Sequence, residues 1–188
     1  MRLSVFCGVS VDGFLARTDD TFDFLTAGEQ EPHGFAEFMA SVDVVVIGRR
    51  TFDVVRKLGH IGLYGKKALV VLSSRPLDYS APKGTALEWE SGEPAEVVKR
   101  LEGRGFRHAY VDGGITIQRF LAAGCITRMV MTRVPVLIGA GISLFGPLPH
   151  DVALRHIRTS TFPGGLVQSE YEVAGTGASA GDGANTQR

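Results

Sequence analysis

Short runs of β-branched residues alternate along this chain with stretches of helical periodicity, and this alternation is the strongest constraint on the fold. The strand-like RLSVFCGV is followed by the helix-like HGFAEFMAS, the strand-like DVVVIG, the helix-like TFDVVRKLG and the strand-like KALVVLSS. The same order continues through EPAEVVKRLEGRG, HAYVDG and ITIQRFLAAG. Strands that are apolar on both faces and separated by helices predict an α/β fold, with a mostly parallel central sheet and helices on both faces.

The last third of the chain breaks this pattern. The segments TRMVMTRVPVLIG, DVALRHIRTSTF and LVQSEYEV follow one another without a helical spacer, and the last of them alternates apolar and polar residues. We therefore expect antiparallel C-terminal strands at the edge of the sheet. The final stretch, AGTGASAGDGANTQR, nearly lacks large apolar side chains. It predicts a disordered Gly/Ala-rich tail over residues 175–188, after a single domain over residues 1–174.

Composition excludes several classes of protein. Twenty basic and twenty acidic residues give a formal net charge of zero, so the chain lacks the basic surface that nucleic-acid binding requires. No apolar run approaches the roughly 20 residues of a membrane-spanning helix. Cys7 and Cys125 are far apart in the sequence and the five histidines lack metal-ligand spacing, which predicts no metal site. We expect a cytoplasmic protein that acts on a small molecule.

The turn Asp112-Gly113-Gly114 joins a predicted strand to a predicted helix. Ligands of open α/β sheets bind outside the carboxyl ends of the strands, and glycines let the backbone approach a ligand closely. The N–H groups of residues 115–117, at the start of the helix, would attract phosphate. A tight turn that requires positive φ explains the glycine pair equally well. On this feature alone both interpretations stay open.

Two further strand ends carry groups suited to phosphate. In VVVIGRRTF, two arginines follow a buried strand, and Thr51 is placed to serve as the N-cap of the next helix. In ALVVLSSRP, two serines and Arg75 follow the next strand. An isolated arginine pair is more often a solvated surface charge, but neighbouring strand ends of this kind predict a phosphate-binding edge. The candidate residues at these two ends are Gly48, Arg49, Arg50, Thr51, Leu72, Ser73 and Ser74.

Two common enzyme signatures are absent from the sequence. No GxGxxG follows the first strand, which argues against an ordinary dinucleotide-binding domain of the Rossmann type. The segment GVSVD departs from the GxSxG nucleophile elbow at its fifth position, which argues against a serine hydrolase.

In their order and spacing, SVDGFLA, IGRRTF, VVLSSRP, YVDGGITIQRFL and PVLIGAGISLFG resemble the dihydrofolate reductase superfamily. The resemblance covers roughly residues 1–173. It is closest to the reductase domain of the bifunctional riboflavin-biosynthesis deaminase-reductase and to stand-alone bacterial proteins related to it. This resemblance implies a dihydrofolate reductase-like three-layer fold and NADPH as the cofactor.

The resemblance also implies roles for the candidate residues. The positions of Arg49, Ser73 and Ser74 would hold the adenosine 2′-phosphate, and Thr51 would face the pyrophosphate. Gly113 and Gly114 would lie against the pyrophosphate and nicotinamide side of NADPH. Ile115 and Thr116 would donate to phosphate. Classical members have a cis peptide at the glycine pair, so the state of the Asp112-Gly113 peptide stays open.

The reaction implied is hydride transfer to a C=N or C=O group with delivery of a proton. The helix carboxylate of the folate enzyme is missing, because its position falls near His33 or Gly34, with Glu37 about a turn away. Asp12, in SVDGF, is the candidate catalytic acid, because riboflavin-type reductases have a similar aspartate that points into the substrate pocket. Asp followed by Gly is also a common turn, which leaves a purely structural role open for Asp12.

The function expected from the resemblance is an NADPH-dependent reductase similar to 5-amino-6-(5-phosphoribosylamino)uracil reductase. A phosphorylated substrate would need its own cation, for which Arg17, Lys66 and Lys67 are available in the sequence. A pterin reductase and a non-catalytic nucleotide-binding or dimerisation module are the alternatives. Related proteins pair through their late strands, so a homodimer is expected.

Overall fold

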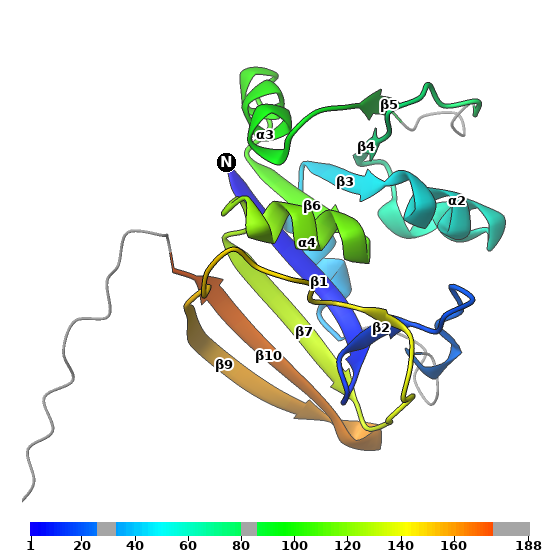
Figure 1. The fold of residues 1–188 in the computed structure, drawn as a ribbon, viewed down its shortest axis with the longest axis vertical. Helices are drawn as coiled ribbons and strands as arrows, with labels where there is room; N and C mark the ends of the chain where they lie inside the picture. Colours follow the sequence, from blue (N-terminus) through cyan, green and yellow to red (C-terminus); the bar gives the residue numbers. More distant parts are fainter. Residues whose placement is uncertain (26–32, 80–85, 175–188) are drawn as a thin grey trace, which may run out of the picture.

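The computed structural model describes residues 1–25, 33–79 and 86–174. An eight-stranded sheet with the order β5-β4-β3-β6-β1-β7-β10-β9 forms the centre of the molecule (Figure 1). Its strands are β1 (Arg2–Ser10), β3 (Val44–Gly48), β4 (Ala68–Leu72), β5 (Leu87–Glu90), β6 (His108–Asp112), β7 (Arg128–Val134), β9 (Leu154–Phe162) and β10 (Leu166–Val173). A small second sheet pairs β2 (Phe14–Ala16) with β8 (Ile142–Ser143). The predicted tail, residues 175–188, lies outside the described residues.

The strand directions confirm the predicted mixed sheet. The neighbours from β5 to β7 pair in parallel. By contrast, β10 is antiparallel to β7, and β9 is antiparallel to β10. The strand that was expected to run through VPVLIG stops at Val134, because Pro135 has no N–H group for the ladder. The short edge strand β5 was not predicted from the sequence, since two of the four residues in LEWE are acidic and no long apolar run is present.

Helices cover both faces of the sheet, as predicted. The helices are α1 (Phe35–Ser41), α2 (Arg49–Lys57), α3 (Pro94–Gly103) and α4 (Gly114–Ala122), with 3₁₀ turns η1 (Asp23–Leu25), η2 (His60–Tyr64) and η3 (Pro163–Gly165). One core forms where α3 and α4 pack on the sheet, and a second forms under α1, α2 and η2. The run Val44 to Ile47 is fully buried because β3 contributes side chains to both cores.

The start of α2 differs from the prediction. Thr51 was expected to be the N-cap, but the helix begins at Arg49 and its N-cap is Gly48, which has an extended backbone and makes no side-chain cap. The strand β3 runs directly into the helix, so no residue separates the two elements. The prediction for Thr51 as a cap is therefore wrong, and its side chain is available for the contact with Gly113 described below.

A buried histidine lies at the amino ends of the central strands. His108 is 6% exposed, with Nε2 2.8 Å from the Ser4 hydroxyl and Nδ1 2.8 Å from the Ser41 carbonyl oxygen. A neutral ring satisfies both contacts when Nδ1 donates to the carbonyl and Nε2 accepts from the hydroxyl. Burial lowers the pKa of His108 below its usual value of 6.5.

Because the unfolded chain then binds a proton more readily than the folded one, we expect stability to fall as the pH drops below about 6.5. The loss from this one group is at most about 1.4 kcal/mol per pH unit. Urea unfolding of the wild type and of His108→Gln at pH 7.5, 6.5 and 5.5 measures it. The variant should be less stable at pH 7.5 and should lose less stability on acidification. Equal losses in the two proteins would contradict the assignment.

Candidate functional site

The structure brings the three predicted strand ends to one edge of the sheet. In the parallel ladders, Gly48 of β3 pairs with Leu72 of β4, and Ile47 of β3 pairs with Asp112 of β6. The loops and helices that follow these strands therefore leave the sheet side by side. This is the carboxyl edge, where open α/β sheets bind their ligands.

A cavity of about 330 Å³ opens at the ends of β3 and β4. Its lining residues are Arg49, Asp53, Leu72, Ser73, Ser74 and Arg75. Within it, the Nε atom of Arg49 donates to Asp53 over 2.8 Å, and its Nη1 atom donates to the Pro76 carbonyl over 3.3 Å. These contacts fix the guanidinium and leave it further N–H donors. Two guanidinium groups beside two hydroxyl groups suit a phosphate monoester.

The turns after β3 and β6 interlock through their glycines and threonines. Gly113 has φ of 95°, and a Cβ added there would overlap Oγ1 of Thr51. In the same way, a Cβ added to Gly48 would overlap Oγ1 of Thr116. Each turn thus requires a glycine where the threonine of the other turn lies. The positive φ that a tight turn would require is present at Gly113, which leaves a ligand-binding role of the turn untested, and every peptide bond in the described part of the chain is trans.

The first turn of α4 lies directly beyond this contact. Gly113 is the N-cap and makes no side-chain cap. The N–H groups of Gly114, Ile115 and Thr116 precede the first intrahelical bond, which runs from the Ile117 N–H to the Gly113 carbonyl. Three N–H groups at a helix N-terminus suit an anion.

The other candidate cations lie outside the cavity at the ends of β3 and β4. Arg50 donates from Nη2 to Asp20 over 3.0 Å, in the segment after β2, and does not line the cavity. Arg17 makes two hydrogen bonds with Asp23, of 2.7 and 3.0 Å. Lys66 and Lys67 directly precede β4, so they lie at the amino edge of the sheet.

Asp12 holds a loop and lies on the surface. Its carboxylate accepts from the N–H groups of Ile138 and Gly139, over 3.2 and 2.8 Å. A hydrogen bond from Ser10, followed by those from Gly139 and Ile138, lowers the pKa of Asp12 below its usual value. A carboxyl group that ionises so easily is poorly suited to deliver a proton at neutral pH.

Asp112 has the opposite environment. Its Oδ2 atom accepts from the Tyr64 hydroxyl over 2.6 Å, and its Oδ1 atom accepts from the Gly113 N–H over 2.8 Å. Burial raises the pKa of Asp112 above its usual value, although these two hydrogen bonds lower it. No sequence signal pointed to Tyr64, because it lies 48 residues away on η2.

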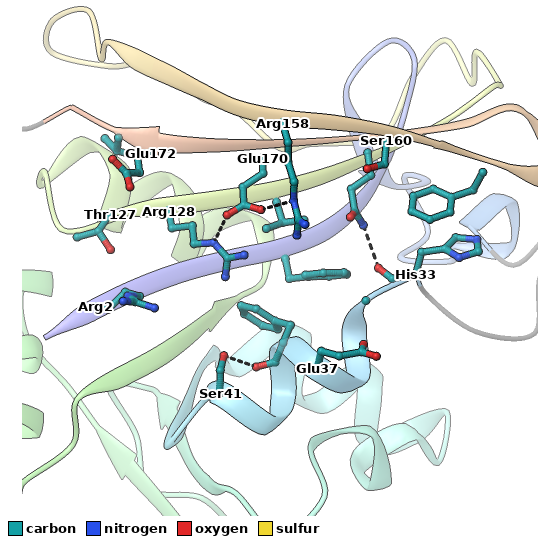
Figure 2. A pocket seen from close by; sticks show the side chains of 17 residues that line it. Arg2, His33, Glu37, Ser41, Thr127, Arg128, Arg158, Ser160, Glu170 and Glu172 are labelled. Carbon is teal, nitrogen blue, oxygen red and sulfur yellow. Dashed lines mark hydrogen bonds and ion pairs between the residues drawn. The ribbon is translucent and has the colours of Figure 1, made fainter.

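A larger groove of about 960 Å³ lies beside α1 on the same face of the sheet, between this helix and the strands β7, β10 and β9 (Figure 2). Glu170 accepts there from Arg128 over 2.7 Å and from Arg158 over 2.9 Å. His33 stacks on Phe162, with 3.8 Å between the ring centroids. Glu37, the carboxylate of α1, also lines this groove. No sequence signal pointed to this groove.

No helix in the described ranges is long and apolar enough to cross a membrane. Among the same residues, no group of three His, Cys, Asp or Glu side chains is placed to hold a metal ion.

The chain matches the model of the RibD C-terminal domain family over residues 2–168. The Bacillus subtilis (strain 168) protein YwjB, whose function is uncharacterised, is 29% identical over 168 residues, covering 89% of this chain and 95% of YwjB. A Shewanella sp. PV-4 protein named after riboflavin biosynthesis has a similar structure, with a TM-score of 0.83 at 32% identity over 93% of this chain and 99% of that one.

Dihydrofolate reductase from Enterococcus faecalis, in complex with NADP(H), is similar with a TM-score of 0.58 at 15% identity, over 92% of this chain and 94% of that one. At this identity the likeness shows the fold alone, which is thus dihydrofolate reductase-like. The family match covers most of the chain and agrees with the architecture, and the chain therefore belongs to the RibD C-terminal domain family.

Proposed function

We propose that this protein is an NADPH-dependent reductase that transfers a hydride to a C=N or C=O group of a small heterocyclic compound. The observation that carries the proposal is the cavity where Arg49 and Arg75 lie beside Ser73 and Ser74, next to the interlocked glycine turns. A site with this donor set at the carboxyl edge suits a phosphorylated dinucleotide.

The residues present fit this cofactor. Arg49, Ser73 and Ser74 would hold the 2′-phosphate, because the fixed guanidinium of Arg49 and the two serines line one cavity. The Ser73 hydroxyl donates to the Arg75 carbonyl oxygen over 2.6 Å and would turn to the phosphate on binding. The N–H groups of Gly114, Ile115 and Thr116 would bind the pyrophosphate, because they have no partner within the helix. When bound, NADPH supplies a hydride to the substrate.

The substrate is proposed to be an aminopyrimidine or a pterin-like compound. The riboflavin-biosynthesis name of the Shewanella protein favours 5-amino-6-(5-phosphoribosylamino)uracil. A substrate without phosphate is the second candidate, because the three cations proposed to hold a substrate phosphate are placed unfavourably. Arg17 is bound to Asp23, while Lys66 and Lys67 lie at the opposite edge of the sheet.

The proposal includes a homodimer that works in the cytoplasm. The strand β9 ends the sheet and is largely exposed along its length, so its outer edge is available for pairing with a second copy.

The test is a titration with NADPH and, separately, NADH, followed by thermal unfolding and by energy transfer from Trp89. Ligand binding to the folded state raises the Tm, and we expect NADPH to raise it more than NADH does. Arg49→Ala should weaken NADPH binding about tenfold or more and leave NADH binding nearly unchanged, since a charged hydrogen bond to the 2′-phosphate is lost.

Arg107→Ala is the matched control, because Arg107 precedes β6 at the opposite edge of the sheet. It should leave the NADPH affinity unchanged. If neither nucleotide binds at millimolar concentration, the reductase proposal fails and a non-catalytic role for the fold is favoured instead.

A further inference from the structure

The cavity at the ends of β3 and β4 contains a carboxylate, a group that phosphate binding does not need. Asp53 lies on α2, one turn after Arg49, and lines this cavity together with Arg49 and Arg75. Two arginines and one aspartate give the lining a net formal charge of plus one. A phosphate monoester carries a charge of about −1.5 to −2 at pH 7. The lining therefore compensates only part of that charge, because Asp53 cancels one of the cations.

The contact between Asp53 and Arg49 decides which edge of the guanidinium can meet a ligand. Oδ2 of Asp53 accepts from Nε of Arg49 over 2.8 Å, and the Pro76 carbonyl accepts from Nη1 over 3.3 Å. These contacts leave N–H donors only on Nη1 and Nη2. A phosphate would therefore bind at the outer edge of Arg49, formed by Nη1 and Nη2, because Asp53 covers the edge that contains Nε.

The second oxygen of Asp53 is open to a ligand. No hydrogen bond from the part of the chain that the structure describes reaches Oδ1, and the side chain is 42% exposed. In dinucleotide-binding sites, a carboxylate accepts from the ribose 2′-hydroxyl of NAD, whereas an arginine accommodates the 2′-phosphate of NADP. This cavity contains both groups. The carboxylate would attract a hydroxyl donor and would repel a phosphate placed beside Arg49.

We propose that Asp53 determines how strongly the site prefers NADPH over NADH, because its carboxylate accepts from the ribose 2′-hydroxyl of NADH and repels the 2′-phosphate of NADPH. This inference rests on the proposed function. Arg49 and the two serines after β4 favour NADPH, while Asp53 gives NADH a hydrogen bond that NADPH cannot make. The wild-type protein therefore binds both nucleotides, and its preference for NADPH is smaller than the arginines alone would produce. Asp53 is a specificity-determining residue and takes no part in hydride transfer.

The first measurement compares the Kd of NADPH with that of NADH, by energy transfer from Trp89, in the wild type and in Asp53→Asn. The amide keeps an oxygen for Nε of Arg49, removes the negative charge and adds an N–H donor. We expect NADPH to bind more tightly and NADH more weakly. The ratio of the two Kd values should change about tenfold or more in favour of NADPH. The Tm without ligand should stay nearly unchanged, because Asp53 lies on the surface.

Asp20→Asn is the matched control. Asp20 pairs with Arg50, the other arginine that follows β3, and it does not line the cavity. Its positive φ of 69° is one that asparagine tolerates. Removal of this charge acts on both nucleotides alike, so the ratio of the two Kd values should equal that of the wild type.

The second measurement confines the effect to the ribose, by calorimetric titration with 5′-AMP, 2′-deoxy-5′-AMP and 2′,5′-ADP. In the wild type, 5′-AMP should bind about tenfold more tightly than its 2′-deoxy analogue, because a hydroxyl that donates to a carboxylate is lost in the analogue. In Asp53→Asn these two fragments should bind more nearly alike. The affinity for 2′,5′-ADP, which carries the 2′-phosphate, should be higher in Asp53→Asn than in the wild type.

The outcomes separate this role from the proposed function. If the wild type binds neither nucleotide at millimolar concentration, the proposed function fails and the role of Asp53 fails with it. If NADPH binds but Asp53→Asn leaves the ratio of Kd values unchanged, or shifts it towards NADH, only the role of Asp53 is overturned. Equal binding of 5′-AMP and 2′-deoxy-5′-AMP to the wild type has the same consequence. So does an equally large shift of the ratio in Asp20→Asn, because overall charge would then explain the effect.

Discussion

Replacing Gly113 by alanine is expected to lower the free energy of unfolding by about 3 kcal/mol and to abolish stabilisation by NADPH. Gly113 has φ of 95° and ψ of 134°, a conformation that side chains with a Cβ rarely adopt. The new Cβ would also overlap Oγ1 of Thr51 and lie 3.0 Å from its Cβ. Relief would require the turn before α4 to move away from α2, and both helices contribute groups to the candidate cofactor site.

Urea unfolding of the wild type and of three variants checks this result. Gly103→Ala is the control, because Gly103 ends α3 with no atom within 4 Å of an added Cβ. It should be neutral or slightly stabilising. In the double variant Gly113→Ala with Thr51→Ala, the overlap disappears but the backbone strain remains, so we expect partial recovery. A Gly113→Ala protein with the wild-type urea midpoint would show that the two turns are not interlocked.

The arrangement of strands and helices was predictable because it depends on local periodicity. Runs such as Val44 to Ile47 are buried on both faces, and their continuous apolar character is visible in the sequence. The start of α2 was not predictable in this way. An N-cap threonine is a common signal, but β3 continues into the helix without a connecting loop, and only the fold shows that Gly48 is the cap.

The edge that carries the site was predicted for a similar reason. Parallel strands place their carboxyl ends together, so residues that follow β3, β4 and β6 had to become neighbours. The reciprocal contacts between glycines and threonines depend on distances of a few ångströms between two turns. The spacing of these residues along the sequence does not determine such distances. The link from Asp112 to Tyr64 spans 48 residues and depends on where η2 packs.

The motif around Asp12 is compatible with two roles. Its segment SVDGF resembles a catalytic segment, yet a short polar side chain beside a glycine also fits a turn. In the structure this carboxylate joins the loop after β1 to the loop after β7. Which backbone N–H groups it meets depends on the parallel pairing of these two strands, and the sequence around Asp12 contains no sign of it.

Phe52→Ala is expected to cost about 3–5 kcal/mol of unfolding free energy. Phe52 is 1% exposed and lies on the face of α2 that packs into the second core. Its ring also meets Tyr79 edge to face, with 5.6 Å between centroids. Truncation leaves a cavity under the helix that carries Arg49 and Thr51, so the candidate cofactor site loses its support along with the core.

Equilibrium unfolding in urea measures the loss, and Leu58→Ala supplies the comparison. Leu58 caps the C-terminus of the same helix and is 48% exposed, so its truncation should cost less than about 1 kcal/mol. NADPH titration at a temperature where both variants are folded separates the effect on NADPH affinity from the loss of stability. We expect weaker binding only in Phe52→Ala, because its cavity lets α2 shift and moves Arg49 away from the two serines that follow β4. Equal costs in the two variants would mean that α2 is held by its exposed end and not by the core.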